Sequence, residues 1–340
     1  KIGIQVLDFA PDDWAEACVE PYKDVLSDPV AWAKKAQDEY GADFIQLWLK
    51  STDPNGNDAS ADDAAATVKN VLAAIDVPLI IWGTASVEKD EEVLKKISEE
   101  CQGKNLILGP VEDKNHKGIG AAAMGFGHTI IASSPIDVNL AKQCNILLEN
   151  LGVSLDKLIV DPTTGGLGYG LEYSYSVMER IRMAALQGDA MLAQPVLAVV
   201  GEQAWKAKEA RLPDEEAPDW GDAAMRGPAW EAATAALFLQ AGTDIVALLH
   251  PEAVANTKRT IAALVGDPPG VDSLIAGALG LLGGGRIERD LLRRGEDEGF
   301  VEELGRVSCD MLDPFLAEEF LDAANGHPLV VKQNLDPADH

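Results

Sequence analysis

The stretch KLIVDPTTGGLGYGLEYSYSVMERIRMAAL, from Lys157 to Leu186, contains one complete strand–turn–helix unit. KLIVD is a short apolar run, and YSVMERIRMAAL repeats apolar residues at the spacing of an amphipathic helix. Between them lie four glycines within six residues. The stretch therefore predicts a buried strand and a helix that are joined by a glycine-rich turn.

The same unit recurs over about the first 265 residues. Eight short apolar runs are each followed by a segment with helical spacing, and they lie at residues 2–7, 43–49, 77–83, 105–109, 128–133, 157–161, 195–200 and 244–250. Eight units in about 265 residues match the length of a (β/α)8 TIM barrel. Runs such as PLIIW lack polar alternation, as expected of parallel strands that are covered on both faces. The sequence predicts an α/β TIM barrel, with an open doubly wound sheet as the alternative.

Glycines mark where several predicted helices end. A residue in the left-handed conformation commonly closes a helix, and glycine adopts that conformation without steric cost. The glycines that follow helical segments in this way are Gly41, Gly103, Gly152, Gly188 and Gly242.

The regular alternation stops near Gly266, where the breaker sequence DPPG follows. We therefore predict a barrel domain over residues 1–266. Residues 267–340 are expected to form an appended C-terminal extension, mostly helical and acidic, whose role is unknown. Its segment LIAGALGLLGGG is too short and too rich in glycine for a transmembrane helix.

Composition disfavours several classes of partner. The chain carries 56 acidic and 28 basic residues, a net charge of −28, which disfavours nucleic acid and anionic membranes. Its apolar runs are far shorter than the roughly 20 residues that span a bilayer, and it shows no secretory signal. A cytoplasmic location is the expectation. Because the chain opens at Lys1 without an initiator Met, we expect a trimmed or fragmentary N-terminus.

The four cysteines are too far apart for a cluster motif. Cys18, Cys101, Cys144 and Cys309 form no CxxC or ferredoxin-like spacing. We expect buried thiols in a reducing compartment, and no iron–sulfur cluster in this chain.

In TIM barrels the reacting groups stand just after each strand, at the C-terminal face. Lys50 follows the second predicted strand, and a Schiff-base aldolase would need such a lysine to be desolvated, but Lys50 borders the polar loop STDPNGND. His250, Glu202 and Asp161 could converge on a metal, although a lone histidine more often has a structural role. We therefore predict neither a catalytic residue nor a metal site.

A serine nucleophile is also disfavoured. Ser133 and Ser134 end the fifth predicted strand, but the only histidine nearby in sequence, His128, lies at the opposite end of that strand. A nucleophilic triad needs the base beside the serine hydroxyl.

The glycine turn after the sixth strand is the main candidate site. It lacks the GK[ST] of a Walker A loop and the spacing of GxGxxG, so it predicts neither a nucleotide phosphate site nor a dinucleotide site. Four missing side chains would instead let a flat, bulky group lie against the main chain, although a wide turn leading into a helix explains the glycines equally well. The predicted cofactor-binding residues are Asp161, Thr163, Thr164, Gly165, Gly166, Gly168, Tyr169, Gly170, Asn139, Gly201 and Glu202.

A long connection follows the seventh strand, GEQAWKAKEARLPDEEAPDWGDAAMRGPAWEAATAALFLQAG. It holds Trp205, Trp220 and Trp230 together with an acidic, proline-containing excursion. Long aromatic loops at a barrel mouth often serve as lids or partner surfaces.

These segments resemble one family in unbroken order over about residues 1–265. DPTTGGLGYGLEYSYSVMERIR, GEQAWKAKEA, NLILGPVEDKNHKGIGAAAM, HTIIASSPIDVNLAKQCNILL and LLHPEAVANTK are similar to the small (delta) subunit of the corrinoid iron–sulfur protein of the acetyl-CoA decarbonylase/synthase system. The combination of the glycine turn with GxxAWxAKEA is specific.

The resemblance implies a TIM barrel, similar in fold to pterin-binding methyltransferases and dihydropteroate synthases, without independent activity. It implies a heterodimer with a large (gamma) subunit that carries a [4Fe–4S] cluster and a corrinoid (cobalamin), which lies at the interface facing the barrel mouth. The heterodimer would take a methyl group from a methyltetrahydrofolate or methyltetrahydropterin methyltransferase and deliver it to acetyl-CoA synthase/CO dehydrogenase, in the reductive acetyl-CoA (Wood–Ljungdahl) pathway of anaerobes.

The chain departs from the family pattern at both ends. Family members usually have residues before the first barrel strand, and residues 267–340 have no counterpart that we can place. A stand-alone pterin-dependent methyltransferase, with Asp161 and Asn139 on the pterin ring, is the alternative function.

Overall fold

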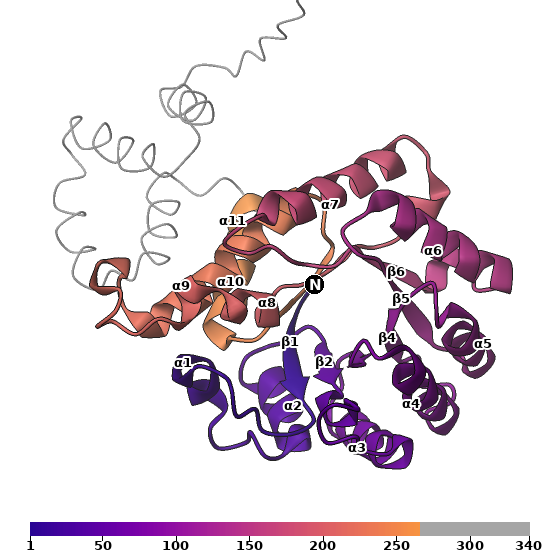
Figure 1. Ribbon diagram of the computed structural model, residues 1–340, viewed down its shortest axis with the longest axis horizontal. Coiled ribbons are helices and arrows are strands. Elements are labelled where there is room, and N and C mark those ends of the chain that lie inside the picture. The colour runs from indigo at the N-terminus through magenta and orange to yellow at the C-terminus, as the bar shows by residue number, and fades with distance from the viewer. Residues whose placement is uncertain (266–340) are drawn as a thin grey trace, which may run out of the picture. The chain divides into compact units, whose positions relative to one another are not determined.

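The computed structural model describes residues 1–265, which lie within one compact unit of the chain. The predicted C-terminal extension lies outside the described residues. Within them, strands and helices alternate from Ile2 to Val265, and Figure 1 shows the helices arranged around the strands. None of the described helices is both long enough and apolar enough to cross a membrane.

Eight parallel strands form the sheet, in the order β6-β5-β4-β3-β2-β1-β8-β7. Their bounds are β1 Ile2–Leu7, β2 Ile45–Trp48, β3 Leu79–Trp82, β4 Ile107–Val111, β5 Thr129–Ser133, β6 Leu158–Asp161, β7 Leu197–Val199 and β8 Ile245–Leu248. The two outer strands meet through a single parallel bridge, Val160 to Val196, and Val160 N–H donates to the Pro195 carbonyl at 2.9 Å. The predicted barrel is thus confirmed.

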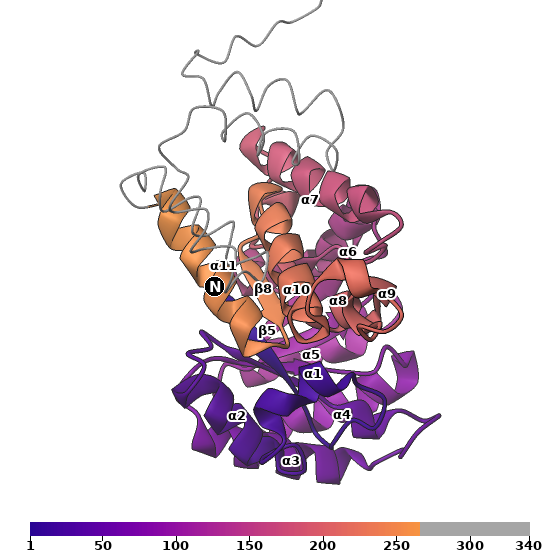
Figure 2. The same ribbon diagram turned by 90° about the vertical axis from the view of Figure 1, so that its left-hand side faces the viewer.

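Eleven α-helices accompany the strands in the described part of the chain. They are α1 Glu16–Val19, α2 Pro29–Asp38, α3 Ala61–Ala74, α4 Val87–Glu100, α5 His116–Phe126, α6 Val138–Leu151, α7 Leu171–Leu186, α8 Gly201–Lys206, α9 Lys208–Arg211, α10 Ala223–Gln240 and α11 Pro251–Val265. Short 3-10 turns occur at Glu20–Tyr22, Lys50–Thr52, Leu155–Lys157, Ala190–Leu192 and Pro218–Trp220. Figure 2 shows α10 and α11 side by side.

The five glycines predicted to close helices all have positive φ, from 64° at Gly41 to 106° at Gly152. One strand runs differently from the prediction. The sequence predicts the fourth strand at 105–109, whereas β4 begins at Ile107 and continues through Pro110 to Val111. The pairing of β4 with β5 shifts register between Leu108 and Val111, which accommodates a proline that donates no ladder hydrogen bond.

Two apolar layers hold the barrel together. One lies between the strands and the helices and includes Ile4, Leu47, Ile81 and Val160. The other fills the interior of the barrel and consists of Phe44, Ile80, Ile131, Ile159, Leu197, Val199 and Ala247. Because side chains fill the barrel interior, a binding site is expected above it, at the C-terminal ends of the strands.

Candidate functional site

The glycine turn runs from the end of β6 to the start of α7, as the sequence predicts. Asp161 ends the strand and is buried, and its two carboxylate oxygens are both occupied. Ser133 Oγ, from the register position opposite on β5, donates to Asp161 Oδ2 at 2.9 Å, and Thr163 N–H donates to Asp161 Oδ1 at 3.0 Å. Burial raises the pKa of Asp161 to about 6. Both oxygens of Asp161 thus accept hydrogen bonds from groups of the protein.

Thr163 adopts a left-handed backbone with φ 65°, which is unusual for a β-branched residue. Its hydroxyl donates to the Ser134 carbonyl at 2.7 Å, so the strained residue is held from both sides. Farther along, Gly165 N–H donates to Ser174 Oγ at 3.1 Å, which ties the turn to α7. The turn is thus a fixed structure and not an open loop.

The glycines of the turn have different reasons for lacking a side chain. Gly166 has φ 73°, and a Cβ there would lie 2.6 Å from the Gly170 carbonyl oxygen, so Gly166 serves the closure of the turn. Gly168 has φ 88° and faces Glu209 of α9. At Gly165 a Cβ would meet only Ile136, at an ordinary 3.4 Å. Neither backbone conformation nor lack of space therefore requires a glycine at position 165.

The tip of the turn presents aromatic surface to solvent. Tyr169 is 89% exposed and Tyr173, on the first turn of α7, is 67% exposed. The Thr164 hydroxyl, by contrast, is buried and has no hydrogen-bond partner among the described residues. A protein rarely leaves such a group unpaired, so Thr164 Oγ1 marks a place where a further polar group would be stabilised.

Gly201 and Glu202 begin α8, at the end of β7. A Cβ on Gly201 would lie 2.5 Å from Gln5 Oε1 and 2.7 Å from the Leu249 nitrogen, so this glycine is required by packing. Glu202 N–H donates to Gln5 Oε1 at 3.0 Å, and its carboxylate pairs with Lys206 at 2.9 Å. Asn139 is exposed in the first turn of α6, and its side chain makes no hydrogen bond to the residues that the structure describes.

A buried carboxylate that the sequence analysis did not single out organises the neighbouring part of the mouth. Glu231 of α10 accepts hydrogen bonds from Trp205 Nε1–H, from Leu249 N–H at 2.7 Å and from His250 N–H at 3.1 Å. Burial raises the pKa of Glu231 to about 8. The long connection after β7 is thereby fixed to the end of β8. Of its tryptophans, Trp205 is buried whereas Trp220 is 46% exposed.

The catalytic alternatives do not gain support from the geometry. His250 is largely buried against Trp205, which lowers the pKa of its imidazole to about 4, and its Nδ1 accepts from Glu252 N–H. In residues 1–265 no three His, Cys, Asp or Glu side chains are grouped so that they could hold a metal ion. His128 bonds to Leu106 and Ser98, far from the Ser133 hydroxyl that donates to Asp161.

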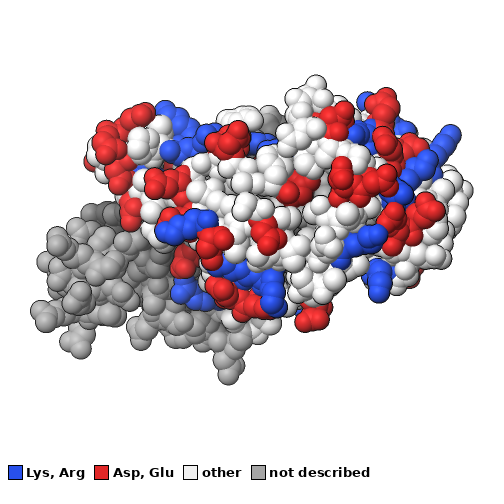
Figure 3. Space-filling model, turned by 90° about the horizontal axis from the view of Figure 1, so that it is seen from below, with Lys and Arg blue, Asp and Glu red and all other residues white. Residues whose placement is uncertain are grey.

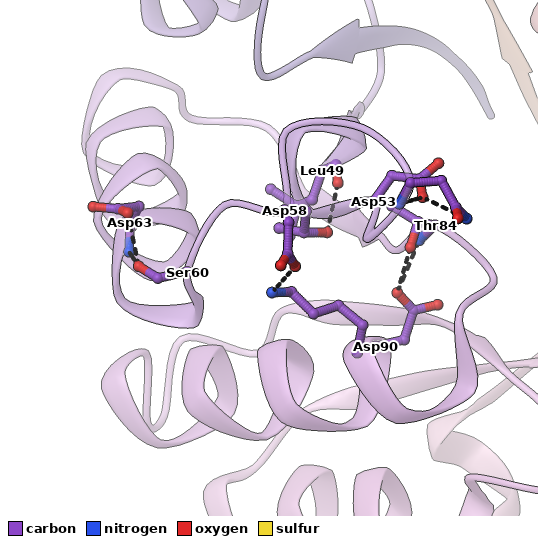
Figure 4. A network of polar contacts seen from close by, with 10 residues as sticks. Leu49, Asp53, Asp58, Ser60, Asp63, Thr84 and Asp90 are labelled. Carbon is purple, nitrogen blue, oxygen red and sulfur yellow. Dashed lines mark hydrogen bonds and ion pairs between the residues drawn. The ribbon is translucent and has the colours of Figure 1, made fainter.

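Hydrogen bonds and an ion pair of two aspartates, Asp58 in the loop after β2 and Asp90 in α4, fix the loops after β2 and β3 (Figure 4). Asp90 of α4 accepts hydrogen bonds from the backbone and the hydroxyl of Thr84, at 2.9 and 3.2 Å, and it packs where Gly83 has no side chain. Asp58 pairs with Lys89 at 2.7 Å. On the face that Figure 3 shows, acidic and basic residues are interspersed, so the strong net charge is spread over the surface there.

Comparison with known proteins places this barrel in a family. The family model of the CO dehydrogenase/acetyl-CoA synthase delta subunit matches residues 1–248. The chain is 39% identical over 257 residues to the acetyl-CoA decarbonylase/synthase complex subunit delta 1 of Methanosarcina thermophila, covering 74% of this chain and 59% of that protein. It is 40% identical over 236 residues to subunit delta of Methanopyrus kandleri, covering 69% and 58%.

The chain belongs to the delta-subunit family of the acetyl-CoA decarbonylase/synthase complex. The family resemblance seen in the sequence is confirmed. The chain spans about three fifths of the length of these delta subunits, 59% and 58% in the two cases above.

Solved structures similar to this delta-family barrel show its fold alone. A dihydropteroate synthase of Xanthomonas albilineans with 4-aminobenzoic acid superposes with a TM-score of 0.53 at 16% identity, covering 78% of this chain and 94% of that one. A dihydropteroate synthase of Stenotrophomonas maltophilia with imidazole gives 0.53 at 18% identity, covering 79% and 94%. Low identity means that these neighbours support the TIM barrel and carry no argument about ligands.

Proposed function

We propose that the chain is a non-catalytic partner subunit that faces the corrinoid of a methyl carrier in the acetyl-CoA decarbonylase/synthase complex. Its partner would be the large subunit with the [4Fe–4S] cluster and the corrinoid. The pair would receive a methyl group from a pterin methyltransferase and deliver it to acetyl-CoA synthase, in the cytoplasm. Membership of the delta-subunit family supports the assignment to the complex.

One observation carries the proposal at the level of residues. The mouth of the barrel offers an exposed aromatic ring and main chain, whereas the nearby carboxylate of Asp161 is taken up by Ser133 and Thr163. Such a surface suits the positioning of a bulky flat group better than it suits acid–base chemistry, because the carboxylate that begins the turn is already engaged by the protein.

The residues present fit a corrinoid. The cofactor is wide and edged with amides, and the exposed Tyr169 ring and the Gly165 backbone stand at the turn for such a group. The corrinoid, when bound, supplies the metal that carries the methyl group. The chain's own part is to present Tyr169 and the turn against the ring, and to exclude water from it.

The test is co-purification of the full chain with the large subunit, followed by an absorbance spectrum of the complex. We expect association with a cluster- and corrinoid-bearing protein, and a weakened complex for Tyr169→Ala and Gly165→Val. Met124→Ala, an exposed apolar residue near the end of α5, is the control. A chain that never associates with such a protein would contradict the proposal. Turnover of methyltetrahydrofolate with free cobalamin by the chain alone would favour the methyltransferase alternative.

A further inference from the structure

A hollow opens at the barrel mouth over the ends of β1, β2, β7 and β8. Its cavity volume is about 50 Å³, and it opens to solvent. This volume is enough for a few water molecules or for one polar group of similar size, and the rest of a larger ligand would lie in the open part of the hollow. Its lining residues are Asp13, Trp14, Ala15, Lys50, Glu202, Trp205, Lys206, Arg211 and Leu249.

Charge sets this hollow apart from the chain as a whole. Three cationic side chains and two carboxylates line it, although acidic residues outnumber basic ones two to one, 56 to 28, in the sequence. Within residues 1–265, Lys50 and Arg211 form no ion pair with a carboxylate. Lys50 Nζ lies 5.2 Å from the centre of the Trp48 ring, and Arg211 donates to the Asp13 carbonyl at 3.3 Å.

Lys206 is the third cation, and it is already paired with Glu202. Two cations therefore remain to bind an anion, and the low-dielectric walls formed by Trp14 and Trp205 would strengthen the attraction. An isolated positive charge beside apolar walls is stabilised by an oxyanion that accepts its N–H groups.

A second observation lies beneath the hollow. Gln5 is fully buried, and its Oε1 accepts from Glu202 N–H, which places the amide under a residue of the lining. Gln5 Nε2 has no partner among the described residues. The same holds for both polar atoms of Gln46, the register partner of Gln5 on β2. Buried amides with unused donors and acceptors are expected to meet a ligand or water.

From these contacts we infer that the hollow is a subsite for a small organic oxyanion, a carboxylate or a phosphate, held by Lys50 and Arg211. The ligand enters from the barrel mouth and packs on Trp14 and Trp205, with its oxyanion between Lys50 and Arg211. This site is distinct from the glycine turn and does not depend on the proposed role in the complex.

Binding is measured on the full chain alone, with inorganic phosphate and glutarate as separate probes and uncharged glutaramide as their comparison. Tryptophan fluorescence and calorimetry report binding directly, because Trp14 and Trp205 line the site. We expect saturable binding of at least one oxyanion, weakening as salt is raised, and none of glutaramide. Phosphate alone or glutarate alone would identify the group that the site takes.

Two substitutions test the residues. Lys50→Gln and Arg211→Gln should each raise the dissociation constant about tenfold, as the loss of a charge-assisted hydrogen bond predicts. Lys104→Gln, an exposed lysine at the opposite end of the barrel, should leave it unchanged. Lys50 makes no side-chain hydrogen bond or ion pair within residues 1–265, so its loss should not perturb folding. Absence of saturable binding by both probes, or binding that Lys50→Gln does not weaken, would overturn the inference.

Discussion

The Thr163 amide donates to the Asp161 carboxylate at 3.0 Å while Thr163 itself holds a left-handed backbone with φ 65°. A β-branched residue in this conformation costs about 1–3 kcal/mol, which the surrounding contacts must offset. The carboxylate offsets part of it, and the Thr163 hydroxyl, bound to Ser134, offsets more. The shape of the glycine turn therefore depends on Asp161.

Replacing Asp161 tests this dependence. Asp161→Ala removes the acceptor for both Ser133 and Thr163 and should lower the free energy of unfolding by about 2–4 kcal/mol. Asp161→Asn can accept from Thr163 N–H through Oδ1 and donate to Ser133 Oγ through Nδ2, so it should stay close to the wild type. Urea unfolding at neutral pH measures both. Equal destabilisation by the two variants would show that the charge, and not the hydrogen bonding, matters.

The buried carboxylate of Glu231 predicts a pH dependence of stability. Its pKa is raised from 4.5 to about 8 in the folded protein, so between these values the folded state holds a proton that the unfolded state has released. Stability should therefore fall as the pH rises from 5 to 8, by at most about 5 kcal/mol from this group. Glu231→Gln cannot titrate and should flatten this slope. Unfolding of the two proteins across this pH range is the measurement, and parallel slopes would contradict it.

Much of this fold can be predicted from sequence, because its signals are local. The strand KLIVD and the glycines that follow several helices are short patterns, and β6 and Gly188 occur where these patterns predict them. Glu231 could not be predicted, because nothing in AWEAATAAL distinguishes it from a surface acid. Its burial depends on Trp205 and on the end of β8, which only the closed barrel brings to it.

The candidate site, too, has features that the sequence predicts and features that only the structure shows. Its four glycines locate the turn correctly, but the sequence cannot separate Gly166, which closes the turn, from Gly165, which has space beside it. The sequence predicts cofactor binding by Gly201, and the structure shows a packing reason for it, contact with Gln5 and Leu249. Such contacts join residues that are distant along the chain, so the spacing of residues in the sequence does not predict them. Whether these residues touch a corrinoid stays a prediction.

The packing role of Gly201 can be tested with a matched glycine. Gly201→Ala would place a methyl group 2.7 Å from the Leu249 backbone nitrogen, which cannot move aside, and should cost about 1–3 kcal/mol. At Gly125 of α5 an added methyl group would have nothing within 4 Å, and the backbone has no positive φ, so Gly125→Ala should stabilise the protein by up to about 1 kcal/mol. Thermal unfolding compares them. Similar melting temperatures for the two variants would refute the packing role.

The last prediction separates the shape of the glycine turn from its surface. Gly166→Ala places a side chain at φ 73° and 2.6 Å from the Gly170 carbonyl, so the turn must open, at a cost of about 1–3 kcal/mol. Gly165→Ala adds a methyl group in ordinary contact with Ile136 and should leave the turn closed. Amide hydrogen exchange over residues 163–174 measures the difference, because Gly165 N–H is protected by Ser174 Oγ only in the closed turn. Faster exchange in Gly166→Ala alone is expected, since only that variant changes the backbone, and equal exchange in both variants would mean that the turn tolerates a left-handed alanine.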